Sequence, residues 1–236
     1  MKLRQLGLAG SFAIYLSAAL LMYIMTSWLI PLLSRETGQE TILFWFIVGG
    51  LCIFTPLLIT AYLILKAEGY RINLSSWKER LRFRRISRSD LIWTLAGFIV
   101  VGVLSMLIMQ LLEHIIGKFD HSPPFMAFEP LNEGRYWLLL VWAPYWVLNI
   151  MGEEILWRGV MLPRQELAFG KYTWLVHGTG WALFHIAFGL TLLITLLPLI
   201  YIQSFIVQKT KNSWVGVLMH GGMNGPAFIA IALGAI

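Results

Sequence analysis

The feature that most constrains the fold is a series of long apolar runs that contain few charged residues. Hydrophobic residues make up 58% of the 236-residue chain and charged residues only 13%. A water-soluble domain could not bury that much apolar surface, so the composition indicates an integral membrane protein. The runs are continuous rather than alternating, which favours membrane-spanning helices over barrel strands. We therefore predict an all-α, polytopic transmembrane helix bundle in the cell membrane.

A helix needs about 20 apolar residues to cross a bilayer, and about seven stretches approach or exceed this length. They are Leu6–Leu33, Thr41–Leu65, Leu91–Ile116, Tyr136–Trp157, Tyr172–Phe188, Leu190–Val207 and Trp214–Ile236. The fifth and sixth stretches are almost contiguous, so we expect one of them to be tilted, broken or re-entrant. The sequence has no internal repeat and no low-complexity linker, which predicts a single integral membrane domain over residues 1–236.

Lysine and arginine are distributed unevenly between the loops. With the N-terminus in the cytoplasm, 15 of the 18 Lys and Arg residues fall on the cytoplasmic side, and only Arg35, Lys118 and Arg135 fall on the other. Because cytoplasmic loops carry the excess of positive charge, we predict a cytoplasmic N-terminus. The loop Lys66–Asp90 holds eight of these residues, and we expect it to bind anionic lipid headgroups rather than nucleic acid. Within it, Leu74–Arg85 fits either an interfacial amphipathic helix or a plain charged loop.

Three charged residues lie together in the fourth apolar run, in the string EEILWR. Glu154 and Arg158 are four residues apart and share a helix face, so we expect them to pair. Glu153 is rotated by about 100° from Glu154 and projects elsewhere. A carboxylate in an apolar pocket suits general-base work on a water molecule. The alternative is a structural ion pair at a helix end, although charges at bilayer depth usually mark functional sites.

Two further polar sets lie in the fifth and seventh runs. In the fifth, HGTGWALFH places His177, Trp181 and His185 along one helix face, and we expect His177, near the cytoplasmic end, to be interfacial. In the seventh, HGGMN places His220 and Asn224 on one face. Unpaired polar groups in lipid are costly. We therefore expect the three sets to converge in one water-filled cavity, where they satisfy one another.

Such a convergence offers the groups that hydrolysis needs. Glu153 would take a proton from a water molecule that His185 helps to hold. His220 and Asn224 would donate hydrogen bonds to the oxyanion of a tetrahedral intermediate. A glutamate with two histidines is also a zinc ligand set, so Glu153, His185 and His220 are alternatively metal ligands.

The three motifs resemble the signature of the CPBP family of intramembrane proteases, the CAAX-protease and bacteriocin-processing (Abi) group. This group includes the Rce1-type CAAX prenyl endopeptidases. The family pattern is Glu-Glu-x-x-x-Arg, Phe-x-x-x-His and His-x-x-x-Asn, each in a different helix. The resemblance covers roughly residues 135–236, the motif-bearing catalytic half. Trp181 stands where Phe is usual, a change that we expect to affect pocket shape more than chemistry.

The resemblance implies an endopeptidase that opens to the cytoplasm, with Glu153 as the catalytic base and Glu154, Arg158 and Trp181 in supporting roles. It implies a membrane-associated protein or peptide substrate, with or without a lipid anchor. No cofactor is firmly implied. The chain lacks His-Glu-x-x-His, which favours water activation without metal, while zinc stays open. Two other functions fit: a non-catalytic scaffold or immunity protein, and a proton-coupled transporter, which the lack of inverted repeats disfavours.

Overall fold

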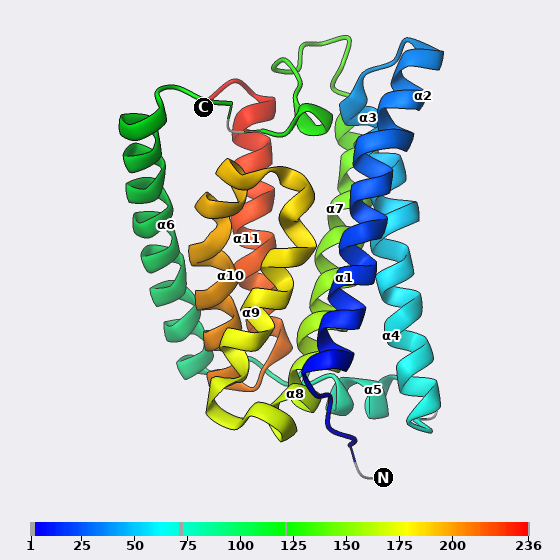
Figure 1. Ribbon diagram of the computed structural model, residues 1–236, viewed down its shortest axis with the longest axis vertical. Coiled ribbons are helices and arrows are strands. Elements are labelled where there is room, and N and C mark those ends of the chain that lie inside the picture. Colours follow the sequence, from blue (N-terminus) through cyan, green and yellow to red (C-terminus); the bar gives the residue numbers. More distant parts are fainter. Residues whose placement is uncertain (1–2, 71–72, 121, 236) are drawn as a thin grey trace.

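The computed structural model describes residues 3–70, 73–120 and 122–235, and this part of the chain is helical without any β-strand. The helices run between two ends of one bundle, with the N-terminus at one end and the C-terminus at the other (Figure 1). The α-helices are α1 (Leu8–Ile24), α2 (Ile30–Thr37), α3 (Thr41–Val48), α4 (Thr55–Ala67), α5 (Leu74–Arg80), α6 (Arg88–Ile116), α7 (Leu138–Glu153), α8 (Leu162–Phe169), α9 (Thr173–Phe184), α10 (Leu190–Thr210) and α11 (Ser213–Ala232). The predicted all-α fold is confirmed.

Three of the long helical segments contain a π-helical stretch with a proline just beyond it. The stretches are Met25–Leu29 between α1 and α2, Gly49–Phe54 between α3 and α4, and Glu154–Met161 between α7 and α8. Pro31, Pro56 and Pro163 stand at the second position of the α-helix that follows each stretch. Proline has no N–H, and its ring collides with the carbonyl four residues earlier. The wider π turn accommodates the ring and keeps each segment continuous.

Five segments of the described chain are long and apolar enough to cross a membrane, and the protein is an integral membrane protein. They are Leu8–Thr37, Thr41–Ala67, Arg88–Ile116, Leu190–Thr210 and Ser213–Ala232. The two remaining predicted spans are also helical but have different limits. The fourth continues past Trp157 as far as Phe169. The fifth corresponds to α9, whose 12 residues make a helix only about 18 Å long, against a bilayer core of about 30 Å.

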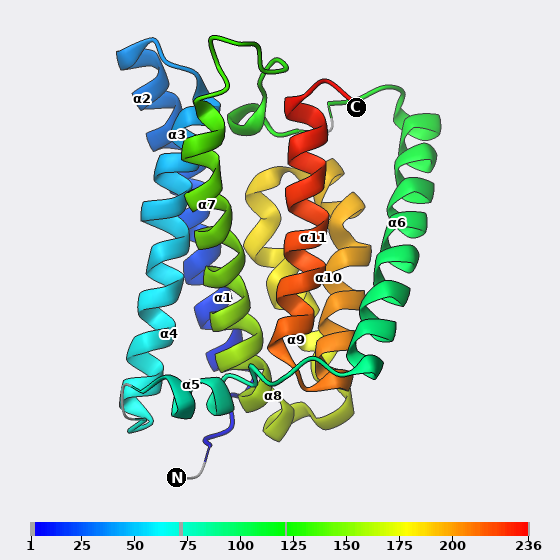
Figure 2. The ribbon, with the colours of Figure 1, turned by 180° about the vertical axis from the view of Figure 1, so that it is seen from behind.

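Helices α9 and α10 form a hairpin that turns inside the bundle, as the contiguous fifth and sixth runs predicted. α9 ends at Phe184, a 3-10 turn covers His185–Phe188, and Gly189 enters α10 with a φ of 86°. The turn lies deeper in the bundle than the neighbouring ends of α7 and α11 (Figures 1 and 2). The hairpin thus brings His185 to mid-depth instead of to the surface, which is what the predicted meeting with His220 required.

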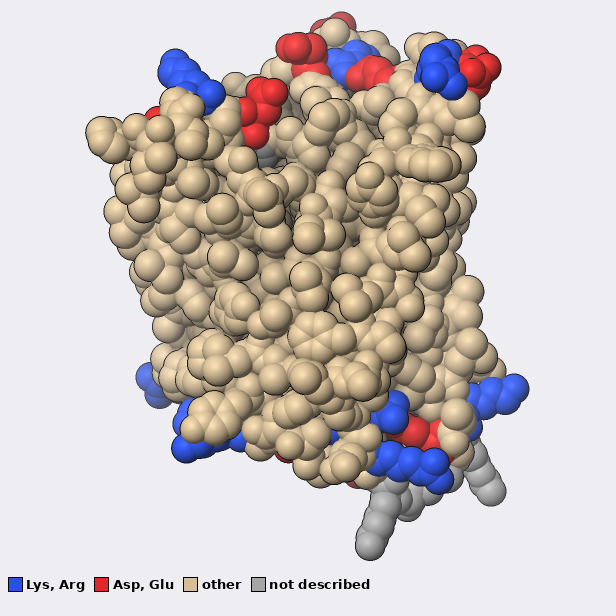
Figure 3. All heavy atoms as spheres, in the orientation of Figure 1, with Lys and Arg blue, Asp and Glu red and all other residues tan. Residues whose placement is uncertain are grey.

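Basic side chains gather at the end of the bundle that holds the N-terminus, which we call the basic end. Figure 3 shows Lys and Arg along this end, a middle belt free of charged side chains on the visible face, and mixed acidic and basic residues at the opposite end. The short helix α5 lies across the basic end (Figure 2). Leu74–Arg80 is helical, as the helix alternative predicted, and residues beyond it do not continue the helix.

Arg80 ties the basic loop to the helix that carries the two glutamates. Its Nε and Nη2 donate to the carboxylate oxygens of Glu68 at 2.8 and 2.9 Å, and its Nη1 donates to the carbonyl oxygen of Gly159 at 2.9 Å. That carbonyl lies four residues before Pro163, which has no N–H to give it. The guanidinium donates to this carbonyl in place of the missing N–H, and its side chain is only 3% exposed.

We expect Arg80→Ala to lower the free energy of unfolding by about 3 kcal/mol, because it leaves the half-buried Glu68 carboxylate and a buried carbonyl without their donor. Denaturant titration of the purified protein in detergent micelles measures the change. Arg85→Ala is the matched control, since Arg85 is exposed in the same loop. Equal stability of the two variants would show that Arg80 does not anchor the helix.

Candidate active site

Glu153, the last residue of α7, has a buried carboxylate held by two neutral donors. Asn149, one turn earlier, donates from Nδ2 to Oε1 at 3.0 Å, and Trp181 of α9 donates from Nε1 to Oε2 at 2.5 Å. The residue is 1% exposed. Its nearest basic group is the Nε2 atom of His185, 3.9 Å from Oε2, which is too far for a direct hydrogen bond. The carboxylate is therefore fixed in orientation without being neutralised by a cation.

Glu154, the next residue, has different partners. Its Oε1 accepts from Gln203 Nε2 at 2.9 Å and lies 3.0 Å from His220 Nδ1 and 3.2 Å from Arg158 Nη1. A Cβ added at position 216 would lie only 2.2 Å from Oε2 of Glu154. The glycine at this position therefore permits the close approach of the carboxylate. Glu154 thus joins the helix of the two glutamates to α10 and α11. The pairing with Arg158 that the sequence predicted is confirmed.

Arg158 is completely buried and lies over the face of an indole ring. Its Cζ is 3.5 Å from the centroid of the Trp181 ring, a cation–π contact that helps to offset the desolvation of the guanidinium. None of its three nitrogens has a hydrogen-bond acceptor in suitable geometry among the described residues, so its pairing with Glu154 is a charge contact. The indole therefore contacts the arginine through its face and Glu153 through its N–H.

Trp181 contributes hydrogen bonding as well as shape to the site. Its ring makes edge contacts with the rings of His185 and His220, each at 5.5 Å between centroids. Its Nε1–H donates to the Glu153 carboxylate, a hydrogen bond that Phe at this position could not make. In this chain the tryptophan stands between the two histidines and sets the orientation of Glu153.

His185 begins the 3-10 turn at the hairpin, and its tautomer follows from its hydrogen bond. Nδ1 lies 2.9 Å from the backbone carbonyl oxygen of Trp181, which can only accept, so Nδ1 carries the hydrogen. In the neutral ring Nε2 is then an acceptor, and this is the atom that faces Glu153 Oε2. His185 and Glu153 present two acceptors to the space between them.

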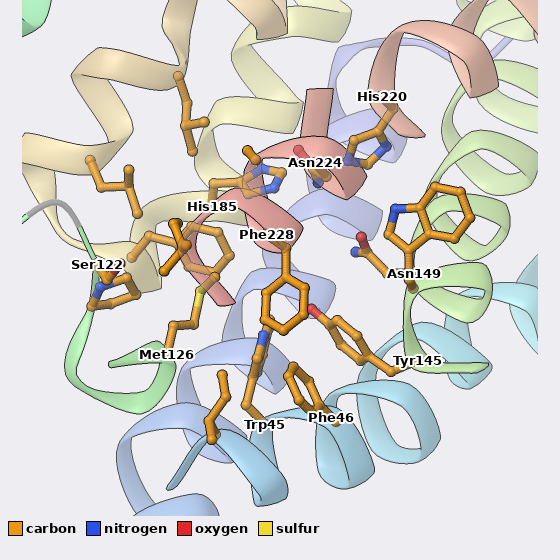
Figure 4. Close-up of a pocket in the computed structure, with 18 of the residues that line it drawn as sticks. Trp45, Phe46, Ser122, Met126, Tyr145, Asn149, His185, His220, Asn224 and Phe228 are labelled. Carbon is orange, nitrogen blue, oxygen red and sulfur yellow. The ribbon is translucent and has the colours of Figure 1, made fainter. Parts of the chain in front are cut away.

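A cavity of about 220 Å³ lies beside this cluster and is lined by residues of the second and third motifs, while Asn149, which donates to Glu153, represents the helix of the first. Its polar lining includes Asn149, Trp181, His185, His220 and Asn224, and much of the remaining wall consists of aromatic and aliphatic side chains. Figure 4 shows His185, His220, Asn224 and Asn149 around the same space as Trp45, Tyr145 and Phe228. The predicted convergence of the fifth and seventh runs beside the glutamates is what the structure shows.

Two polar residues of the cluster were missed from the sequence, and one expectation was wrong. Asn149 and Gln203 each stand in an apolar run and each contact a glutamate, so the signal was an isolated amide at bilayer depth. His177, expected at the interface, is 0% exposed. Its Nδ1 lies 2.7 Å from Gln165 Oε1 and 3.0 Å from the Tyr15 hydroxyl. It belongs to a separate buried network away from the cavity lining.

The arrangement does not form the zinc site that the sequence left open. Among the described residues, no three His, Cys, Asp or Glu side chains lie close enough together to hold a metal ion. The Nδ1 atom of His220 is occupied by Glu154, and both oxygens of Glu153 accept hydrogen bonds. Glu153, His185 and His220 therefore do not fit a metal in this geometry.

Comparison with known proteins finds a family model that matches the motif-bearing segment. Residues 135–225 match the family model described as type II CAAX prenyl endopeptidase Rce1-like, and this segment contains all three motifs from Glu153 to Asn224. No curated protein and no solved structure matches the chain. The match covers residues 135–225, less than half of the chain, and it confirms the resemblance that the motifs of this segment carry.

Proposed function

We propose that the protein is an intramembrane endopeptidase in which Glu153 activates water to hydrolyse a peptide bond of a membrane-associated protein or peptide. The family match supports the reaction class. The assignment of Glu153 rests on one observation, the contrast between the two adjacent glutamates. Glu154 pairs with Arg158, whereas Glu153 accepts from neutral donors and faces His185 across 3.9 Å.

The gap between Glu153 and His185 suits a bridging water molecule. Two acceptors that stand too far apart to contact each other can each accept one hydrogen from the same water. The oxygen of that water keeps its lone pairs for the cavity, where a carbonyl carbon of the substrate would lie. As the oxygen attacks, one proton passes to Glu153, which acts as general base. His185 positions the water through Nε2.

The attack forms a tetrahedral intermediate whose oxyanion needs donors. Asn224 lines the cavity one turn beyond His220. Its side-chain amide does not titrate, so its N–H groups can donate to the oxyanion at any pH. His220 can add a second donor from Nε2 when that atom carries a hydrogen. When the intermediate collapses, the carbon–nitrogen bond breaks, and Glu153 returns its proton to the leaving amine. The products are an amine and a carboxylic acid, which keeps the second hydrogen of the water, and Glu153 is regenerated as a carboxylate.

Glu154 and Arg158 support this site without touching the substrate. Their contacts run to Gln203, His220 and Trp181, which hold α9, α10 and α11 against the helix of the glutamates. Both residues are 0% exposed. Their role in the proposal is to fix the positions of His220 and Trp181 relative to Glu153.

We expect Glu153→Gln to abolish cleavage while the protein stays folded and inserted, because the amide keeps the size of the side chain but cannot take a proton. General bases contribute about 10² to 10⁴ in rate, so activity should fall to background. Membrane proteomes of cells that express each form are compared for new peptide termini. Glu79→Gln, an exposed change in α5, is the matched control and should retain the wild-type pattern. Wild-type termini with Glu153→Gln would refute the assignment.

The neighbouring substitution should behave differently. Glu154→Gln leaves the buried Arg158 without a counter-charge, and breaking a buried pair in this way costs about 3 kcal/mol or more. We expect its free energy of unfolding in detergent micelles to drop by that amount, while Glu153→Gln changes it much less. A similar loss in both variants would show that the two glutamates do not divide into a catalytic and a structural residue.

A further inference from the structure

The cavity beside Glu153 extends toward the end of the bundle opposite the basic end. Its deepest polar residues are those around Glu153, and its upper wall includes Ser122, Met126 and Phe128 of the segment that joins α6 to α7. That segment lies at the end where α11 and the chain terminate (Figures 1 and 2). The family resemblance predicted a site that opens to the cytoplasm. With a cytoplasmic N-terminus, that would be an opening at the basic end.

A second hollow continues from the first toward that end. It has a volume of about 650 Å³ and lies between the α6–α7 segment and the turn of the α9–α10 hairpin, with Gly189 and Thr191 in its wall. Ser122, Phe128 and Phe188 line both spaces. Asp120, which is exposed, also lines the second hollow. The hollow exists because the hairpin turns before it reaches the end of the bundle.

The route toward the basic end is filled by side chains. Between Glu154 and that end, Leu156, Trp157 and residues 160–162 are all 0% exposed. Gly159 packs tightly against the side chain of Leu81. A Cβ added to Gly159 would lie only 2.8 Å from Leu81 Cδ2, so no space remains between them. Arg80 donates to the carbonyl of Gly159 across the same surface. A substrate coming from the basic end would have to displace this packing.

The distribution of basic residues decides which side each end faces. Only Arg35, Lys118 and Arg135 of the 18 Lys and Arg residues belong to segments at the end where the cavity opens. Two of them are paired, Arg35 with Glu36 and Arg135 with Glu40. Because an excess of Lys and Arg retains loops in the cytoplasm, the basic end is the cytoplasmic one. The cavity then opens to the other side of the membrane.

We infer that the scissile bond reaches Glu153 from the non-cytoplasmic side, on an extended apolar segment of a membrane-associated polypeptide that enters beneath the α6–α7 segment. This inference rests on the proposed endopeptidase function and specifies its substrate. The aromatic wall of the cavity suits apolar side chains, and the polar groups at its floor suit the peptide bond itself. A tail that stays in the cytoplasm does not reach the site, so such tails are not substrates.

The side from which the cavity is reached can be measured by thiol labelling. Cys52, the one native cysteine, is first replaced by Ser, and Thr191→Cys then places a thiol in the wall of the second hollow. Ser75→Cys, on the exposed face of α5 at the basic end, is the matched control. Right-side-out and inside-out membrane vesicles are treated with a membrane-impermeant maleimide, and incorporation is compared between the two.

We expect Thr191→Cys to react in right-side-out vesicles and not in inside-out ones, and Ser75→Cys to show the opposite. Labelling at position 191 should also suppress the new peptide termini that depend on Glu153, because the bulky adduct fills the entrance. Reaction of Thr191→Cys only in inside-out vesicles, or in neither, would overturn the inference. Because labelling is read without any cleavage, this failure is distinct from a failure of the Glu153→Gln test.

Discussion

The structure depends on how three charged side chains are kept together at mid-bundle. Glu154 and Arg158 compensate each other, and the Trp181 ring covers the guanidinium that has no further acceptor. This leaves Glu153 as a buried carboxylate with neutral partners, Asn149 and Trp181. Burial of an ion requires compensation by charge or hydrogen bonds. Using charge for one glutamate and hydrogen bonds for the other gives two adjacent, identical side chains different chemistry.

Backbone geometry separates the two glutamates as much as their partners do. Glu153 ends an α-helix, and Glu154 begins the π-helical stretch that Pro163 requires. π-helical turns inside α-helices often occur at functional sites, where they redirect side chains. The same proline cannot donate to the carbonyl of Gly159 four residues earlier, and Arg80 from the basic loop does donate to it. A surface loop and the site are thus coupled through one helix.

The sequence was sufficient to find the motif residues because each stood out against an apolar background. Charges and histidines at bilayer depth must find partners, so their convergence followed from burial cost alone. Asn149 and Gln203 were overlooked because amides are uncharged and a single one in an apolar run is less conspicuous. The hydrogen bond from Trp181 to Glu153 was also missed, since no local pattern tells where an indole N–H will point.

The sequence alone determined that the chain forms membrane helices, that one of the fifth and sixth runs would be tilted, broken or re-entrant, and which end carries the positive charge. These are local properties, set by apolar length and by the hydration of Lys and Arg. Only the tertiary structure decided that Trp157 and its neighbours fill one end of the bundle while the hairpin leaves the other end hollow. Whether space between helices stays open depends on side chains from several distant segments, and no one segment encodes it.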